Sequence, residues 1–288
     1  MSITTRIREA MNRGLSAFNL RLETRTAERV EDARLGDLSS AGRFARPVFP
    51  VPAAFSAIAA EEILAEVGRH GDVFRAWAAP EGGPTGFTLR NSWFTSPDAE
   101  VLYALVRSRR PRRIVEVGCG NSTRVARQAI RDGGLRTELL CIDPEPRRDV
   151  SGMADRLLLQ RVESLRGGGF PELLPGDFLF IDSSHVAAAG GDVVYLFLEV
   201  LPALPPGVLV HVHDVYLPFE YPEAWVVEER RGYDEQYVLQ AWLAGDPRSR
   251  VLWASRYLES RDPGLASRFP WSPGVHGSSL WFLRSAEA

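Results

Sequence analysis

The chain has 288 residues, of which 45% are hydrophobic and 25% charged, and its formal net charge is −3. These values are typical of a globular protein, and the near-neutral charge argues against a dedicated nucleic-acid binder, which needs a basic surplus to neutralise phosphates. The apolar runs are shorter than the roughly 18 residues that indicate a membrane-spanning helix, so we predict no span.

The cysteine content points to a reducing compartment. Only Cys119 and Cys141 are present, and the first residues lack the charged and then apolar pattern of a secretory leader. We therefore expect a cytoplasmic protein in which both cysteines are small buried hydrophobic residues. All 34 basic residues are arginine, which excludes lysine as a catalytic base.

The first 90 residues are predicted to form a helical extension and an arm. Apolar residues recur every three or four positions near the start, which indicates an amphipathic helix; the set is Ile3, Ile7, Met11, Leu15, Phe18 and Leu22. The proline-punctuated stretch 45–52 favours an extended arm or boundary, and residues 55–67 favour a helix. We expect residues 1–90 to cover the substrate or to contact a second copy in a homodimer.

Residues 91–288 alternate between strand and helix patterns. A helix is expected from Ser96 to Arg110, where Pro111 stops it. The expected strands are 114–117, 139–143, 157–162, 177–182, 207–214, 250–257 and 279–284, and further helices are expected over 125–130, 190–201 and 233–243. The fold class is therefore α/β, a doubly wound, Rossmann-like seven-stranded sheet with an N-terminal helical extension.

A glycine turn follows the first of these strands. Gly118 and Gly120 allow the backbone to approach a ligand closely, and a polar residue at 121–123 can cap the next helix, leaving N–H groups that point into the crevice. Thr123 stands where a dinucleotide fingerprint requires its third glycine. Glu116 would also repel a pyrophosphate, so a cationic or zwitterionic ligand fits this turn better.

A second strand ends in an acid, Asp143, 23 residues after Gly120. An acid at this spacing can accept hydrogen bonds from ribose hydroxyls. Pro144 follows it, which places Asp143 at a turn. Together the two strands and the helix between them predict a site for an adenosine-like ligand.

Glu116-x-Gly118-x-Gly120 resembles the first motif of class I S-adenosylmethionine (SAM)-dependent methyltransferases, in which the glycine turn runs under the amino-acid part of the cofactor. The strands that end at Asp182 and at Asp214 are similar to those of the subgroup with catechol-type and macrolide-sugar O-methyltransferases. The resemblance covers roughly residues 90–285. We expect SAM to be bound by residues of the turn and of the strand ends: Glu116, Gly118, Gly120, Asn121, Ser122, Asp143, Glu163, Ser164 and Asp182.

The same subgroup holds a divalent metal with an acid after the fourth strand and an acid–amide or acid–acid pair after the fifth. The resemblance implies Asp182 at the first position and His213 with Asp214 at the pair. An imidazole among carboxylates moves the preference from Mg²⁺ toward Mn²⁺, Fe²⁺ or Zn²⁺. Where catechol-type enzymes carry a lysine base, this chain has His185, which titrates near neutral pH and can take the acceptor's proton.

The sequence thus favours a SAM-dependent methyltransferase that O-methylates a small hydroxylated metabolite, with or without a metal. Its expected catalytic residues are His185 and Asp182. A metal-dependent oxygenase or hydrolase built from His185, His213 and Asp214 is an alternative. A non-catalytic partner protein that keeps SAM as a structural ligand is another.

Overall fold

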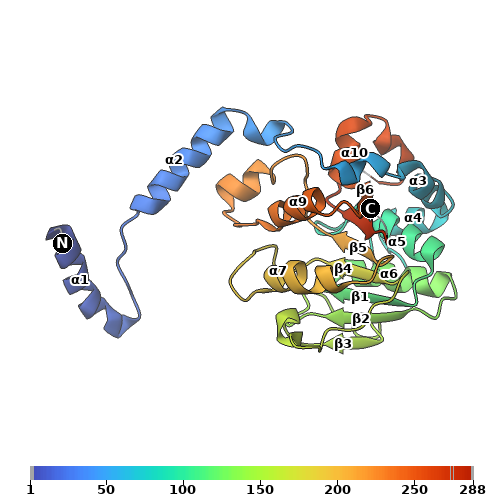
Figure 1. The fold of residues 1–288 in the computed structure, drawn as a ribbon, viewed down its shortest axis with the longest axis horizontal. Helices are drawn as coiled ribbons and strands as arrows, with labels where there is room; N and C mark the ends of the chain where they lie inside the picture. The colour runs from blue at the N-terminus through green and yellow to red at the C-terminus, as the bar shows by residue number, and fades with distance from the viewer. Residues whose placement is uncertain (1–2, 273, 275, 287–288) are drawn as a thin grey trace. The chain divides into compact units, whose positions relative to one another are not determined.

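The computed structural model describes residues 3–272, 274 and 276–286 (Figure 1). It divides into two compact units: Met1–Arg46 with Pro222–Arg231, and Pro47–Tyr221 with Gly232–Ala288. Residues 47–90 thus belong to the same unit as the sheet. The boundary at residue 90 follows the extent of the resemblance, and it stays a prediction.

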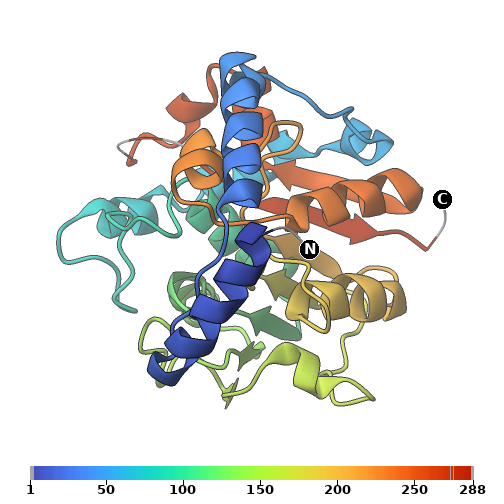
Figure 2. The same cartoon turned by 90° about the vertical axis from the view of Figure 1, so that its left-hand side faces the viewer.

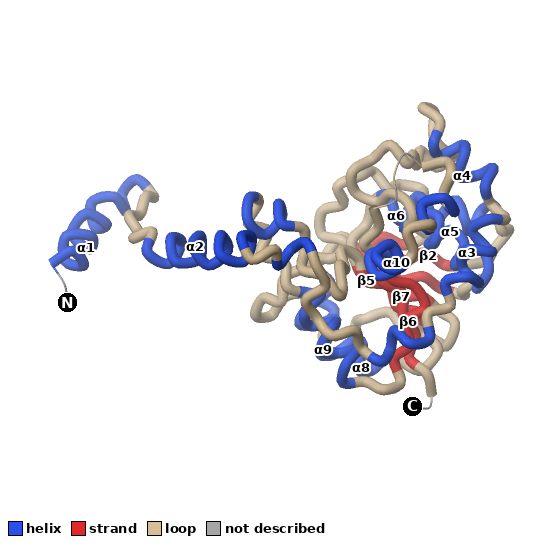
Figure 3. The backbone as a smooth tube through the Cα atoms, turned by 90° about the horizontal axis from the view of Figure 1, so that it is seen from above, coloured by secondary structure: helices blue, strands red, loops and turns tan. Residues whose placement is uncertain are grey.

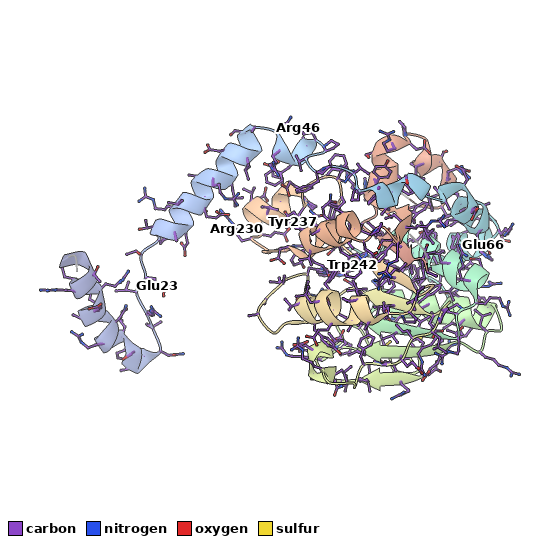
Figure 4. All side chains as sticks on the ribbon, in the orientation of Figure 1. Glu23, Arg46, Glu66, Arg230, Tyr237 and Trp242 are labelled. Atoms are coloured by element: carbon purple, nitrogen blue, oxygen red, sulfur yellow. The ribbon has the colours of Figure 1, made fainter. Side chains whose placement is uncertain are left out.

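The smaller unit is built on helices. Helix α1 (Ile3–Leu15) and the short turn η1 (Ser16–Phe18) are followed by an extended stretch, α2 (Thr26–Ser40) and η2 (Arg43–Ala45) (Figure 2). The first helix ends before Leu22 because Asn19 adopts a left-handed conformation that closes the turn. Asp32 of α2 forms an ion pair with Arg230, which Figure 4 labels, beside the π-helical turn η6 (Ala224–Glu228).

The larger unit contains the predicted seven-stranded sheet, in the order β3-β2-β1-β4-β5-β7-β6. The first five strands in this order run parallel, and β7 is antiparallel to both β5 and β6. The strands are β1 (Arg113–Val117), β2 (Glu138–Ile142), β3 (Arg156–Leu158), β4 (Phe178–Ile181), β5 (Leu209–Val212), β6 (Ser249–Ala254) and β7 (Leu280–Arg284). The doubly wound, Rossmann-like fold class is confirmed.

Helices cover both faces of this sheet (Figure 3). One face packs against α3 (Ala60–Gly68), α4 (Gly71–Ala78), α5 (Asp98–Arg109) and α6 (Asn121–Asp132). The other packs against η3 (Ala53–Ala57), the continuous run of α7 (Asp192–Tyr195), η5 (Leu196–Val200) and α8 (Leu201–Ala203), and α9 (Glu235–Gly245), on which Figure 4 labels Tyr237 and Trp242. Alternate strand residues supply the two cores, as Ile114 and Val115 show.

Several element boundaries differ from those expected, and the helix expected over 55–67 is divided into η3 (Ala53–Ala57) and α3 (Ala60–Gly68). Helix α5 begins at Asp98, because the Ser96 hydroxyl donates to the Glu100 carboxylate and does not cap the helix. Strand β6 ends at Ala254, where the chain turns into α10 (Ser255–Arg261). The third strand stops at Leu158, and its expected end lies in the short turn η4 (Val162–Leu165). A last short turn, η7, spans Leu265–Arg268. Among the described residues, no helix is both long and apolar enough to cross a membrane.

Candidate cofactor site and catalytic cluster

Gly118 is required by the packing of the turn on the neighbouring strand. Its φ is +83°, a left-handed conformation, and a Cβ placed on it would lie 1.9 Å from the carbonyl oxygen of Asp182. Its N–H donates to the carbonyl of Ile142 over 3.0 Å. Gly118 therefore brings the ends of β1, β2 and β4 together, a contact that no other residue allows.

The reason for a glycine at position 120 is different. The φ of Gly120, 173°, lies outside the left-handed region, so the backbone argument made for Gly118 does not apply to it. A Cβ built there meets no atom within 4 Å. The missing side chain leaves open space over the turn, which is where the sequence placed the cofactor.

Glu116 is buried beneath the turn, with 2% of its surface exposed. Its carboxylate accepts hydrogen bonds from the hydroxyl of Ser122 over 2.5 Å and from that of Thr123 over 2.7 Å, and from the thiol of Cys141. Burial raises the pKa of Glu116 to about 7, against the lowering effect of these hydrogen bonds. In the structure Glu116 and Ser122 anchor the start of α6 to β1, a set of contacts different from the cofactor contacts that we expected.

Asp143 closes the turn from the side of β2. One carboxylate oxygen accepts from the N–H of Cys119 and the other from the N–H of Glu145, each over 2.8 Å. The side chain is partly exposed, and each oxygen has a second lone pair with which to accept a ribose hydroxyl.

Glu163 and Ser164 have local partners in turn η4. The Ser164 hydroxyl donates to the carbonyl of Arg161 over 2.6 Å, and the Glu163 carboxylate lies 3.6 Å from the Arg161 guanidinium. Glu163 is partly exposed and Ser164 is exposed. The structure does not itself tie either of them to the glycine turn.

A loop that the sequence analysis missed links the turn to the strand-end histidines. The side-chain oxygen of Asn91 accepts hydrogen bonds from the backbone N–H groups of Trp93 and Phe94. The same oxygen also accepts a hydrogen bond from the side-chain amide of Asn121 over 3.1 Å. The Trp93 carbonyl lies 3.4 Å from Nε2 of His213, while the indole is 59% exposed. An isolated asparagine in a polar loop offers no periodic or motif signal, so this role was not visible in the sequence.

The ends of β4 and β5 bring Asp182, His185 and Asp214 together. Nε2 of His185 lies 3.3 Å from Oδ1 of Asp182 and 3.5 Å from Oδ2 of Asp214. The His185 side chain is almost completely buried, but that of Asp182 is 33% exposed, so the cluster can be reached from outside. Glu235, which was not predicted, lies 2.8 Å from Nδ1 of His185.

Charge determines the proton affinities in this cluster. Burial alone would raise the pKa of Asp182, but His213 and His185 lower it to about 2. Burial alone would lower the pKa of His185, yet Asp182 and Glu235 raise it well above its usual value. The cluster thus couples an acidic carboxyl to a strongly basic imidazole.

His213 lies on the α5 side of the cluster. Its Nδ1 is 3.5 Å from the Ser279 hydroxyl and 4.0 Å from Oδ2 of Asp98, and its Nε2 is 3.9 Å from Oδ1 of Asp214. Burial would lower the pKa of His213, but Asp182, Asp214 and Asp98 raise it. His211, by contrast, is fully buried, and its Nε2 lies 2.8 Å from the Ser279 hydroxyl. Burial lowers the pKa of His211 well below its usual value.

The predicted metal ligands do not close around a common point. Among the described residues, the one group of three donor atoms that all lie within 4.8 Å of one another is Glu116, Cys119 and Cys141. Asp182, His213 and Asp214 form no such group, and Nε2 of His185 lies between the two carboxylates. The donor set does not fit an ion in this arrangement.

Residues 115–215 match a family model described as a methyltransferase domain. This segment, 101 of the 288 residues, is therefore similar to a methyltransferase domain. The matched segment begins in β1 and ends one residue after Asp214, so it includes the turn, Asp143 and the cluster around His185, but not Glu235. The open space over Gly120 and the free lone pairs of Asp143 fit SAM, the cofactor that the sequence predicted.

Solved structures of low sequence identity are also similar to this chain. An O-methyltransferase from Bacillus cereus with S-adenosylhomocysteine (SAH) shares 15% identity, covers 78% of this chain and 91% of its own, and gives a TM-score of 0.43. A SAH-bound methyltransferase from Podospora anserina shares 19% identity over 92% of this chain and 98% of its own, with a TM-score of 0.44. At these values neither likeness carries an argument. No curated protein matches the chain.

Proposed function

We propose that this chain is a SAM-dependent methyltransferase, which transfers a methyl group from SAM to a hydroxyl of a small metabolite. The observation that carries the proposal is the double contact of Asp182. Its carbonyl oxygen lies against Gly118 of the cofactor turn, and its carboxylate lies 3.3 Å from Nε2 of His185. One residue therefore connects the turn to the imidazole, at the edge of the sheet where ligands of open α/β folds bind.

The charges around the cluster favour a cationic ligand. Four carboxylates, those of Asp98, Asp182, Asp214 and Glu235, lie within 4.0 Å of the imidazole nitrogens of His185 and His213. Even if both imidazoles carry a proton, the carboxylates are in excess, and a positive charge beside them lowers their mutual repulsion. SAM, when bound, supplies a methyl group on a sulfonium centre.

His185 is the proposed base. An acceptor hydroxyl beside the exposed edge of Asp182 would reach Nε2, which takes its proton while Asp182 and Asp214 hold the ring and the acceptor in line. Because the pKa of His185 is raised, its ring can act as a base only in those protein molecules whose imidazole has already lost its proton to water. Asp143 is the proposed acceptor of the ribose hydroxyls, and Asn121 lies at the edge of the same cradle.

We derive no step through a metal ion, because the donor set does not fit one. We expect turnover to survive exhaustive chelation, and a loss that Mn²⁺ or Mg²⁺ restores would contradict this. The oxygenase or hydrolase built from His185, His213 and Asp214 is not favoured, since the matched family is a methyltransferase domain. Residues 1–90 are proposed to cover the acceptor or to contact a second copy.

The proposal is tested by incubating the full chain with a small-molecule extract and SAM labelled in its methyl group. We expect label in a hydroxyl-bearing metabolite, together with SAH, and its loss in His185→Asn. If SAH binds but no metabolite is labelled, the chain is a non-catalytic SAM-binding protein. Label on a nitrogen or carbon would contradict O-methylation.

A further inference from the structure

Glu235 is a buried carboxylate with one partner. It is the first residue of α9, and 1% of its surface is exposed. Its Oε2 lies 2.8 Å from Nδ1 of His185, while its Oε1 is buried without a hydrogen-bond partner. Burying a carboxylate with an unsatisfied oxygen costs free energy, so a role beyond packing would account for an acid at this position.

The backbone around this pair is fixed independently of the contact between the Glu235 and His185 side chains. The carbonyl of His185 accepts the N–H groups of both Asp234 and Glu235, over 3.0 and 3.2 Å. The Asp234 carboxylate accepts a hydrogen bond from the N–H of Ala187 over 2.6 Å. The ring of Tyr233 packs on the imidazole of His185, with 4.7 Å between the two ring centroids. The start of α9 is thereby joined to the residues after β4, and His185 keeps the unusual φ of +62°.

We infer that Glu235 is the positioning residue for His185, an inference that rests on the proposed role of His185 as base. The Glu235 carboxylate accepts the hydrogen of Nδ1, and this turns Nε2 toward Asp182 and Asp214. When Nε2 takes the acceptor's proton, the hydrogen on Nδ1 stays in place and the carboxylate stabilises the charge of the ring. The acid of a hydrolase triad orients its histidine in the same way.

The first test measures the hydrogen bond itself and needs no acceptor. With ¹⁵N-histidine, a strongly hydrogen-bonded Nδ1–H gives a downfield proton signal, and the chain has five histidines, so loss in His185→Asn assigns it. We expect the signal in the wild type and in the control Glu259→Gln, a partly buried acid of α10, and its loss in Glu235→Ala. A wild type without the signal, or Glu235→Ala that keeps it, overturns the inference.

The second test separates positioning from folding. Calorimetry should give the same SAH affinity for the wild type, Glu235→Gln and Glu235→Ala. With an acceptor from the labelling experiment, kcat should fall by about 10²-fold in Glu235→Ala and by less in Glu235→Gln, whose amide oxygen can still accept from Nδ1, while the acceptor's KM changes little. Equal kcat in all three overturns the inference.

The two failures are distinguishable. If no acceptor is labelled although SAH binds, the proposed function fails while the Nδ1–H signal still decides the orientation of His185. If Glu235→Ala does not fold, Glu235→Gln carries both measurements. A Glu235→Gln variant that matches the wild type in kcat and retains an unshifted Nδ1–H signal shows that the charge of Glu235 is not needed, and it overturns the inference.

Discussion

Gly118 and Gly120 of the turn are glycines for different reasons. At Gly118 the protein itself occupies the space, since the carbonyl oxygen of Asp182 lies 1.9 Å from the position of a Cβ. At Gly120 no atom of the described residues lies within 4 Å of that position, and its φ lies outside the left-handed region. The first glycine is therefore needed for folding, and the second is needed only if a ligand lies there.

This difference gives a matched pair of variants. Gly118→Ala should lower the free energy of unfolding by several kcal/mol, or prevent folding, because of its left-handed φ and the clash. Gly120→Ala should change stability by less than about 1 kcal/mol and weaken SAH binding at least tenfold. Urea unfolding and calorimetry measure the two effects. Unchanged SAH affinity in Gly120→Ala would place the cofactor elsewhere.

A second residue, Glu100, should make stability depend on pH. It is fully buried, and burial raises its pKa to about 7, from 4.5 in the unfolded chain. Between these values the folded state binds more protons, so the free energy of unfolding falls as pH rises from about 4.5 to 7. For this one group the loss is at most about 3 kcal/mol.

Glu100→Gln should remove that loss, because the amide does not titrate. The measurement is urea unfolding of the wild type and of Glu100→Gln at pH 5 and pH 8, with the exposed Glu62→Gln as control. The wild type should lose more stability than Glu100→Gln between the two values, and Glu62→Gln should behave like the wild type. Parallel losses in all three proteins would show that Glu100 titrates normally.

At the level of elements, the start of α6 is tied to β1 by side chains and not by the backbone ladder. The hydroxyls of Ser122 and Thr123 both donate to Glu116, and the Thr123 oxygen also accepts the N–H of Gly120 over 2.9 Å. The position of the turn, and so of the proposed cofactor site, depends on this buried carboxylate. Removing one of these hydroxyl donors leaves an oxygen of the buried Glu116 carboxylate without that hydrogen bond.

Thr123→Val keeps the volume and removes the hydroxyl. We expect a loss of about 1–3 kcal/mol in the free energy of unfolding, together with weaker SAH binding, because Gly120 loses its acceptor. Thr26→Val, at an exposed position at the start of helix α2 in the smaller unit, serves as control for the exchange itself. If Thr123→Val lowers stability but leaves SAH affinity unchanged, the anchor does not set the position of the cofactor.

At the scale of the whole molecule, the features that could be predicted from the sequence are those formed by residues close together in the chain. The strand, glycine turn and helix around Gly118 are consecutive in the chain, and the polar strand ends at Asp182 and Asp214 are visible because apolar runs precede them. Partners that are distant in sequence were missed. Glu235 is 50 residues from His185, and no periodicity relates Asn91 to Asn121. The burial of Glu116 was missed because the motif does not show which face of β1 holds its side chain.

The last prediction concerns the N-terminal helices. Several apolar residues of the smaller unit are exposed on it, namely Ile7, Met11, Phe18, Leu20, Leu22 and Val30. Deleting residues 1–25 removes α1 and η1 but retains α2, whose Asp32 pairs with Arg230. Because the larger unit has its own two cores, SAH affinity and melting temperature should stay unchanged. If the segment joins two copies, sedimentation should show half the mass; if it covers the acceptor, the acceptor's KM should rise. A truncated chain equal to the full chain in mass and in KM would contradict both roles.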